Sequence, residues 1–163
     1  MFDGRFRVNI SKVTDPVGKV LVRLGVSADV LTGSGLVFAF VTAWAISRGM
    51  HWPAIFLLTA TGFHDMFDGS VAKASSRVSI RGSFFDSVVD RVSDAVVIIG
   101  CADLLIRQHR QELALLPMGI MVAQFVISYA RAKAESLGIP AKGGLMERAE
   151  RMIVLGVALL AKP

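Results

Sequence analysis

The sequence of 163 residues is poor in several residue types, and each scarcity narrows what the protein can be. Its only cysteine, Cys101, excludes an intrachain disulfide and is expected to be a reduced packing residue in an apolar stretch. Charge is missing from two whole segments, because no Asp, Glu, Lys or Arg occurs from Val30 to Ser47 or from Leu113 to Ala130. The first 27 residues hold five Lys or Arg and no apolar core of the signal-peptide type, so no cleavable signal is expected.

The uncharged segments predict membrane helices. Each is 18 residues long, close to the roughly 20 residues with which a helix crosses a bilayer. A third segment, 49–64, lacks Asp, Glu, Lys and Arg for 16 residues. Hydrophobic residues make up 53% of the chain and the mean hydropathy is +0.58. Buried helices of a soluble domain explain several such runs in so short a chain poorly, so the fold class predicted is an all-α, polytopic transmembrane helix bundle.

Helical spacing of the apolar residues predicts an amphipathic interfacial helix over about 10–25, which Pro16 begins or kinks. Five apolar stretches follow, with Asp29 as the expected N-cap of the first. Their expected ranges are 29–47, 53–74, 84–106, 113–137 and 152–161. We therefore expect one domain over 1–163, divided into an interfacial segment (1–27) and transmembrane helices (28–163).

The basic residues are distributed unevenly over the loops. Thirteen Lys and Arg fall on one side of the expected bundle, four on the other, and Arg91 lies within a helix. The positive-inside tendency predicts a multi-pass protein of the cell membrane whose basic side faces the cytoplasm. The net charge of +5 is not taken to indicate nucleic acid, because the basic residues flank apolar helices and no aromatic residues alternate with them.

Four aspartates share that cytoplasmic side. Asp65 and Asp68 lie three residues apart at the end of the second expected spanning helix, and Asp86 and Asp90 lie four apart at the start of the next. Each pair therefore shares a helix face, and a short loop should make the two helices antiparallel neighbours whose acidic faces converge. Clustered carboxylates within a membrane protein require compensating cations.

Oxygen ligands favour a hard ion, Mg²⁺ or Mn²⁺, over zinc. Enough carboxylates for two ions suit phosphoryl transfer, in which metal neutralises phosphate charge. Gly69 and Gly82 beside the aspartates would let a diphosphate approach the backbone closely, although packing or turn roles also explain single glycines. Asp94 continues the series as a fifth ligand or, the preferred interpretation, as a structural partner of a cation such as Arg91.

Residues 65–90 contain the motif D-x-x-D-G-x-x-A-K, a spacer of eight, and G-x-x-x-D-x-x-x-D. This motif resembles the signature of the CDP-alcohol phosphotransferases, with Lys73 where that family usually has arginine. Lysine keeps the charge but loses the bidentate fork. The resemblance implies a metal-dependent enzyme that transfers a phosphatidyl group from a CDP-lipid to an alcohol and releases CMP.

The resemblance also implies a role for each matching residue. Asp90 is the expected general base, and two Mg²⁺ or Mn²⁺ ions are expected. The implied metal ligands are Asp65, Asp68, Asp86 and Asp90. The implied contacts to the CDP-lipid are Asp29, Val30, Leu31, Thr32, Gly69, Lys73 and Ser79.

The identity of the acceptor depends on a second basic region. Residues 128–135 and 143–151 resemble the bacterial phosphatidylinositol-phosphate synthases, whose acceptor is inositol 1-phosphate. Arginines there can bind a phosphate, although positive-inside topology and local Glu–Arg pairs also produce such clusters. The implied acceptor-phosphate ligands are Arg131, Lys133, Arg148 and Arg151.

Two alternatives stay open at this point. The first is a phosphatidylglycerophosphate synthase, because its acceptor, glycerol 3-phosphate, also carries a phosphate. The second is a membrane cation transporter, which is disfavoured because all four aspartates lie near one interface rather than along the helix depth. The partners implied by the resemblance are CDP-diacylglycerol, a phosphorylated alcohol, the lipid bilayer and a second copy in a homodimer. The family generally has six spanning helices, so a C-terminal truncation is also expected.

Overall fold

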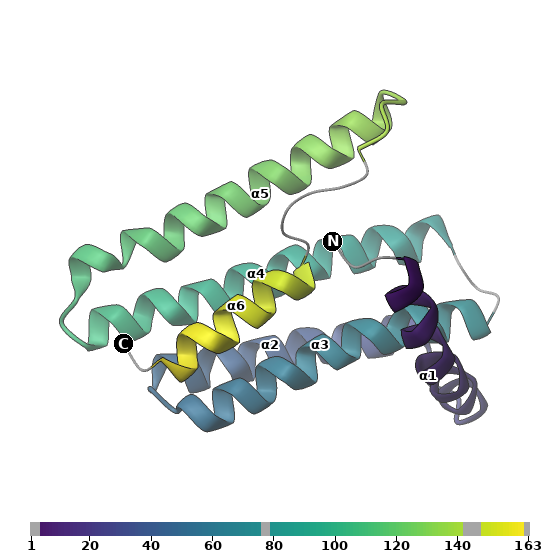
Figure 1. Cartoon of the computed structure of the whole chain (residues 1–163), viewed down its shortest axis with the longest axis horizontal. Coiled ribbons are helices and arrows are strands. Elements are labelled where there is room, and N and C mark those ends of the chain that lie inside the picture. Colours follow the sequence, from purple (N-terminus) through teal and green to yellow (C-terminus); the bar gives the residue numbers. More distant parts are fainter. Residues whose placement is uncertain (1–3, 76–78, 142–147, 162–163) are drawn as a thin grey trace.

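The computed structural model of the chain describes residues 4–75, 79–141 and 148–161, and the regular structure in those ranges is entirely helical (Figure 1). This agrees with the predicted fold class. The elements in chain order are α1 (Gly4–Arg23), α2 (Ala28–Ser47), α3 (His51–Ala74), α4 (Ile80–Arg107), the short 3-10 helix η1 (Gln111–Leu113), α5 (Leu115–Ser136) and α6 (Arg148–Leu160).

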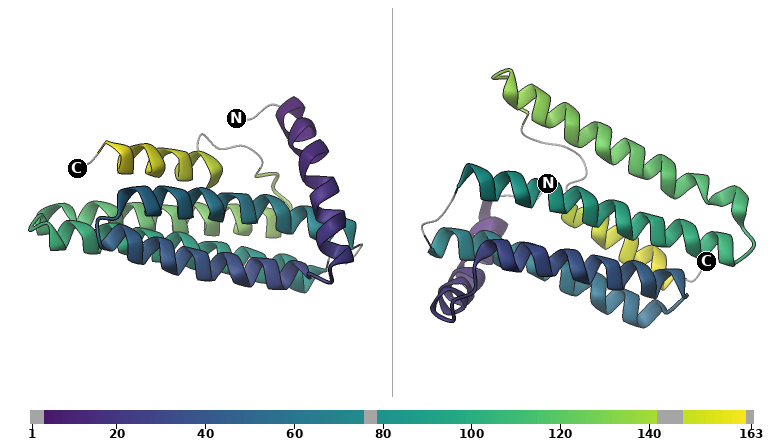
Figure 2. Two further views of the ribbon diagram at one scale, coloured as in Figure 1. Left: turned by 90° about the horizontal axis from the view of Figure 1, so that it is seen from below. Right: turned by 180° about the vertical axis from the view of Figure 1, so that it is seen from behind.

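Helix α2 is the centre of the bundle, because it packs against both α3 and α4. Helix α1 crosses the end of α3, α6 lies on α3, and α5 flanks α4 at the edge of the molecule (Figures 1 and 2). Helices α3 and α4 are antiparallel, as predicted. In the part of the chain that the structure describes, however, no close backbone contact joins them, so the expectation that they are direct neighbours is corrected: they are held together through α2.

Small residues allow these helices to approach closely, as is common in membrane bundles. A Cβ atom on Gly100 of α4 would lie 2.6 Å from the carbonyl oxygen of Ala43 in α2, and one on Gly18 of α1 would lie 2.8 Å from backbone atoms of Ser70 in α3. These two crossings therefore depend on glycine. A buried apolar core cluster contributed by α2, α3, α4 and α6 consists of Ala39, Ala45, Ile46, Ala54, Leu58, Val97, Leu104 and Leu159.

Two serines set where the helices nearest the site begin. The side chain of Ser27 accepts a hydrogen bond from the backbone N–H of Val30 at 3.3 Å, so Ser27 and not Asp29 is the N-cap of α2. Ser79 caps α4 in the same way, with its Oγ 2.9 Å from the N–H of Gly82. Because of this cap, α4 begins at Ile80, four residues before its predicted start.

Within the described residues, two helical segments are long and apolar enough to cross a membrane, Ala28–Ser47 and Gln111–Ser136. They contain the two uncharged runs of the sequence. Helix α5 ends at Ser136, and Gly138 follows with a φ of 74° that suits glycine. Helix α6 begins at Arg148, so the basic residues that precede its apolar part belong to the helix.

Candidate active site

A small pocket brings together residues that are far apart in the sequence. It is lined by parts of α2, α3, α4 and α6. The residues around it are Leu31, Thr32, Gly35, Thr61, His64, Val89, Asp90, Ser93 and Arg148. One pocket thus contains the expected general base, two expected contacts to the CDP-lipid and one expected ligand of the acceptor phosphate.

Asp90 is the acidic group of this pocket, and its side chain is 22% exposed. Arg148 of α6 lies against it, with Nη1 2.7 Å from Oδ1 of Asp90. Arg91, the next residue along α4, approaches the other carboxylate oxygen at 3.5 Å. Cations from two helices therefore orient this carboxylate, and one of them, Arg148, is 58 positions from Asp90 in the sequence.

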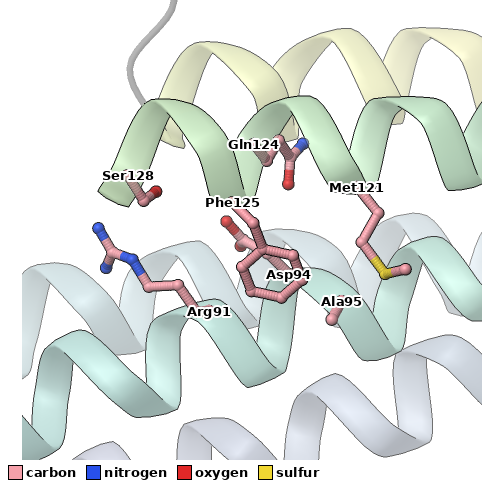
Figure 3. Close-up of a pocket in the computed structure, with 7 residues that line it drawn as sticks. All are labelled: Arg91, Asp94, Ala95, Met121, Gln124, Phe125 and Ser128. Atoms are coloured by element: carbon pink, nitrogen blue, oxygen red, sulfur yellow. The ribbon is translucent and has the colours of Figure 1, made fainter. Parts of the chain in front are cut away.

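Asp94, one helical turn beyond Asp90, pairs with two arginines of α6. Its Oδ1 accepts a hydrogen bond from Nε of Arg148, and its Oδ2 accepts one from Nη2 of Arg151, both at 3.1 Å. The preferred interpretation of Asp94 as the partner of a cation is confirmed, but the cations in direct contact are Arg148 and Arg151 and not Arg91. Figure 3 shows Arg91 and Asp94 on α4 facing Gln124 and Ser128 on α5 across a second small pocket.

The aspartates proposed as metal ligands are described to different extents. Asp86 and Asp90 lie one turn apart on α4. Asp65, Asp68 and Lys73 belong to the C-terminal half of α3, but their side chains lie outside the part that the structure describes. Among the described side chains, no group of three or more His, Cys, Asp or Glu could hold a metal ion. The donor chemistry of Asp86 and Asp90 nevertheless fits a hard divalent cation, because both offer only carboxylate oxygen.

The residues proposed to contact the CDP-lipid lie in different environments. Leu31 and Thr32 line the pocket, and the Thr32 hydroxyl donates to the carbonyl oxygen of Ala28 at 3.1 Å. Asp29 and Val30 are exposed in the first turn of α2. Gly69 has open space where a Cβ would point, whereas the hydroxyl oxygen of Ser79 is used as the cap of α4.

The four proposed acceptor ligands separate into two pairs. The side chains of Arg148 and Arg151 on α6 are 16% and 23% exposed and contact α4. Arg131 and Lys133 on α5 are exposed, and Arg131 pairs with Glu135 of its own helix at 3.2 Å. A largely apolar cavity of about 500 Å³ lies between α4, α5 and α6, with Arg148 and Arg151 in its wall.

Several pocket residues had no role in the sequence interpretation, and His64 is the titratable one among them. His64 lines the same pocket as Asp90, its Nδ1 lies 3.0 Å from the carbonyl oxygen of Ala60, and its ring packs on Phe38 at a centroid distance of 4.7 Å. In the sequence, only the position of His64 next to Asp65 could have indicated that it belongs to the site. That signal is weak, because a helix neighbour usually points to another face.

Comparison with known proteins agrees with this architecture, in which packed helices surround a pocket that contains an aspartate and an arginine. The sequence model of the CDP-alcohol phosphatidyltransferase family matches residues 26–162. The chain belongs to this family, whose members are membrane-integral transferases. The membership favours an enzyme over a transporter.

Individual relatives share most of the chain. An archaetidylinositol phosphate synthase of Methanothermobacter thermautotrophicus is 37% identical over 96% of this chain and 76% of its own length. A phosphatidylinositol phosphate synthase of Cutibacterium acnes is 36% identical over 94% of this chain and 75% of its own.

A solved relative shares the fold. The crystal structure of the Mycobacterium tuberculosis phosphatidylinositol phosphate synthase with CDP-DAG bound superposes with a TM-score of 0.81 and 28% identity, covering 91% of this chain and 75% of that one. The same enzyme has been crystallised with manganese and citrate; that structure has a TM-score of 0.79 and 29% identity, over 90% of this chain and 71% of the other.

Proposed function

We propose that this chain transfers the phosphatidyl group of CDP-diacylglycerol to the hydroxyl of inositol 1-phosphate, giving phosphatidylinositol phosphate and CMP. The relatives named above support inositol phosphate as acceptor, because the archaeal and the bacterial proteins differ in lipid but share that headgroup. The crystal structure of the mycobacterial enzyme with CDP-DAG supports the donor.

The observation that carries the proposal is the shared pocket of Asp90, Thr32 and Arg148. A reaction between a CDP-lipid and a phosphorylated alcohol requires a base near the hydroxyl, a surface for the nucleotide and a cation for the acceptor phosphate. The three residues come from α4, α2 and α6 and supply one group for each requirement.

We propose Asp65, Asp68, Asp86 and Asp90 as the residues that hold divalent metal, Mg²⁺ or Mn²⁺, with two ions in the site. When bound, such ions would neutralise the charge of the diphosphate and help to align the reacting groups. The manganese in the crystal structure of the mycobacterial relative supports divalent metal of this kind.

In the proposed reaction, Asp90 accepts the proton of the acceptor hydroxyl as its oxygen attacks the β-phosphorus of the CDP-lipid. A bond forms between the acceptor oxygen and this phosphorus, and the bond from phosphorus to the CMP oxygen breaks. Gly69, Lys73 and the start of α2 hold the CDP-lipid. Arg148 and Arg151, with Arg131 and Lys133 on α5, bind the acceptor phosphate.

A product assay tests the proposal. Purified protein is incubated with CDP-diacylglycerol, Mg²⁺ and either inositol 1-phosphate or glycerol 3-phosphate; CMP is quantified and the lipid product is identified by mass spectrometry. We expect CMP and phosphatidylinositol phosphate with the first acceptor only, and loss of both when EDTA removes the metal.

The other outcomes discriminate between the alternatives. A lipid product with glycerol 3-phosphate alone would replace the proposed function by phosphatidylglycerophosphate synthesis. If neither acceptor supports the release of CMP, both acceptor hypotheses are rejected. A parallel reaction with a CDP-activated archaeol tests the donor, and a preference for it would correct the lipid but retain the headgroup.

We also propose a multi-pass protein of the cell membrane, one catalytic domain over 1–163, with the site facing the cytoplasm and two chains forming a homodimer. The excess of Lys and Arg on the side of the aspartates supports the orientation. Cysteine labelling from the two sides of sealed vesicles tests it: a single cysteine in place of Ser79, in a Cys101→Ala background, should react from the cytoplasmic side only.

A further inference from the structure

Asp94 lies outside the aspartate motif, where the polar side chains of α4 and α6 meet. Its side chain is 15% exposed, and it lines both the pocket between α4 and α5 and the larger cavity that α6 closes. Arg148 lines that cavity as well as the pocket of Asp90. Asp94 and Arg148 therefore connect the apolar cavity with the proposed reaction site.

Both carboxylate oxygens of Asp94 are engaged by arginine. Arg148 contacts Oδ1 and Arg151 contacts Oδ2, across 54 and 57 positions of sequence. This arrangement makes Asp94 the shared ion-pair partner of the two arginines. It also orients both guanidinium groups from a single point.

Ion pairs link α4 to the first turn of α6. In the described residues, the backbone of α6 packs closely on α3, and no close backbone contact joins it to α4. The first turn of α6 thus reaches the acidic face of α4 through side chains. A change at Asp94 should therefore alter the orientation of Arg148 and Arg151 more than the packing of α6.

Arginine can hold a carboxylate and a phosphate at the same time. A guanidinium has five N–H donors in a fixed planar fork. Asp94 uses one from each arginine in the hydrogen bonds given above, and Nη1 of Arg148 also pairs with Asp90. A planar group that is already oriented loses less side-chain freedom when it binds a phosphate. Removing the carboxylate would therefore weaken acceptor binding without removing any group that touches the acceptor.

We propose that Asp94 is a positioning residue for the acceptor: it holds Arg148 and Arg151 in the orientation in which they bind the phosphate of the acceptor alcohol. This inference rests on the proposed function for the role of the two arginines. It assigns Asp94 no contact with substrate and none with metal.

The test compares two aspartates of α4. Asp94→Asn keeps the shape of the side chain and removes its charge. Asp103→Asn is the matched control, because Asp103 also pairs with an arginine, Arg107 at 2.7 Å, but within its own helix. Neither residue lines any of the three pockets described above. For each variant, KM for inositol 1-phosphate, KM for CDP-diacylglycerol, kcat and Tm are measured in the same detergent.

We expect Asp94→Asn to raise KM for the acceptor about tenfold, equivalent to about 1.4 kcal/mol, with KM for the donor unchanged. Asp103→Asn should change neither. If the ion pairs were merely structural, their loss would lower Tm and change the KM values of both substrates alike. Equal changes in the two KM values would therefore overturn the inference. So would an unchanged acceptor KM, or the same acceptor effect in Asp103→Asn.

Two further arms keep the inference testable. If Asp94→Asn does not fold, Asp94→Glu retains the charge but displaces it; a selective rise in acceptor KM supports the inference, and no selective rise overturns it. If the wild type makes no inositol lipid, the proposed function fails separately. Calorimetric binding of glycerol 3-phosphate then decides: weaker binding to the variant supports the inference, and equal or absent binding to both proteins rejects it.

Discussion

Helices α4 and α5 follow one another in the sequence, are both long and flank each other in the structure, yet their environments differ. Helix α4 is packed on α2 through Gly100 and carries ion pairs to α6. In α5 only Pro117 is buried, and its ion pair, Arg131–Glu135, is local. The difference shows that charges of similar appearance in the sequence acquire different roles when one helix is enclosed by others and its neighbour is not.

The exposed side of α5 is nevertheless apolar. Its large uncovered side chains include Leu115, Leu116, Ile120, Val122, Val126 and Ile127. In a membrane such a surface is matched by lipid chains and needs no protein cover. Helix α5 therefore contributes the outer wall of the cavity, while α4 positions the acidic groups.

The largest expected effect concerns the acidic face of α4. Asp90→Asn should lower kcat by about 100- to 10,000-fold, because an amide cannot accept the proton of the acceptor hydroxyl. CDP-lipid binding should be largely retained, since the substitution changes none of the residues assigned to the donor. Single-turnover CMP release and a separate binding measurement check the two parts. Near-normal turnover would remove Asp90 from the role of base.

A smaller effect is expected where α4 crosses α2. Gly100→Ala would place a Cβ 2.6 Å from the carbonyl oxygen of Ala43, and such overpacking costs about 1–3 kcal/mol. Gly119→Ala in α5 is the matched control, because a Cβ there meets nothing within 4 Å. The Tm in detergent should fall for the first variant only. Equal values for both would mean that α4 is no more tightly packed than α5.

The smallest effect is expected at the exposed end of α5. Arg131→Gln removes an exposed ion pair between residues four apart, a contribution of about 0.3–0.5 kcal/mol, so Tm should hardly change. Its rise in acceptor KM should be smaller than that of Arg151→Gln, because Arg131 is not held by α4. Glu135→Gln controls for the local pair. An acceptor KM raised equally by Arg131→Gln and Arg151→Gln would show that α5 closes onto the site when substrate binds.

Much of this organisation could be predicted from the sequence. Uncharged runs and helical spacing predict the helices, and the starts of α2 and α3 were expected within two residues. The errors have different causes. Ser79 accepts the N–H of Gly82, so α4 begins earlier than its apolar pattern, which is a local effect. The direct packing of α3 on α4 was predicted from a short loop, which fixes the direction of two helices but not the helix that fills the space between them.

The candidate site, too, was predictable only in part from the sequence. Spacing alone places Asp86 and Asp90 on one face of a helix, because the α-helical period is a local property of the backbone. Which cation faces Asp94 is decided by contacts across 54 and 57 residues, and local spacing favoured Arg91 instead.

The sequence by itself determined the helical class, the acidic motif and the family, since these depend on composition, period and residue identity. Only the tertiary structure decided that α2 lies between the two acidic helices, that α6 supplies the paired arginines and that α5 does not. The physical reason is that ion pairs and close crossings join residues whose distance in space is set by the packing of whole helices, and no local pattern encodes that distance.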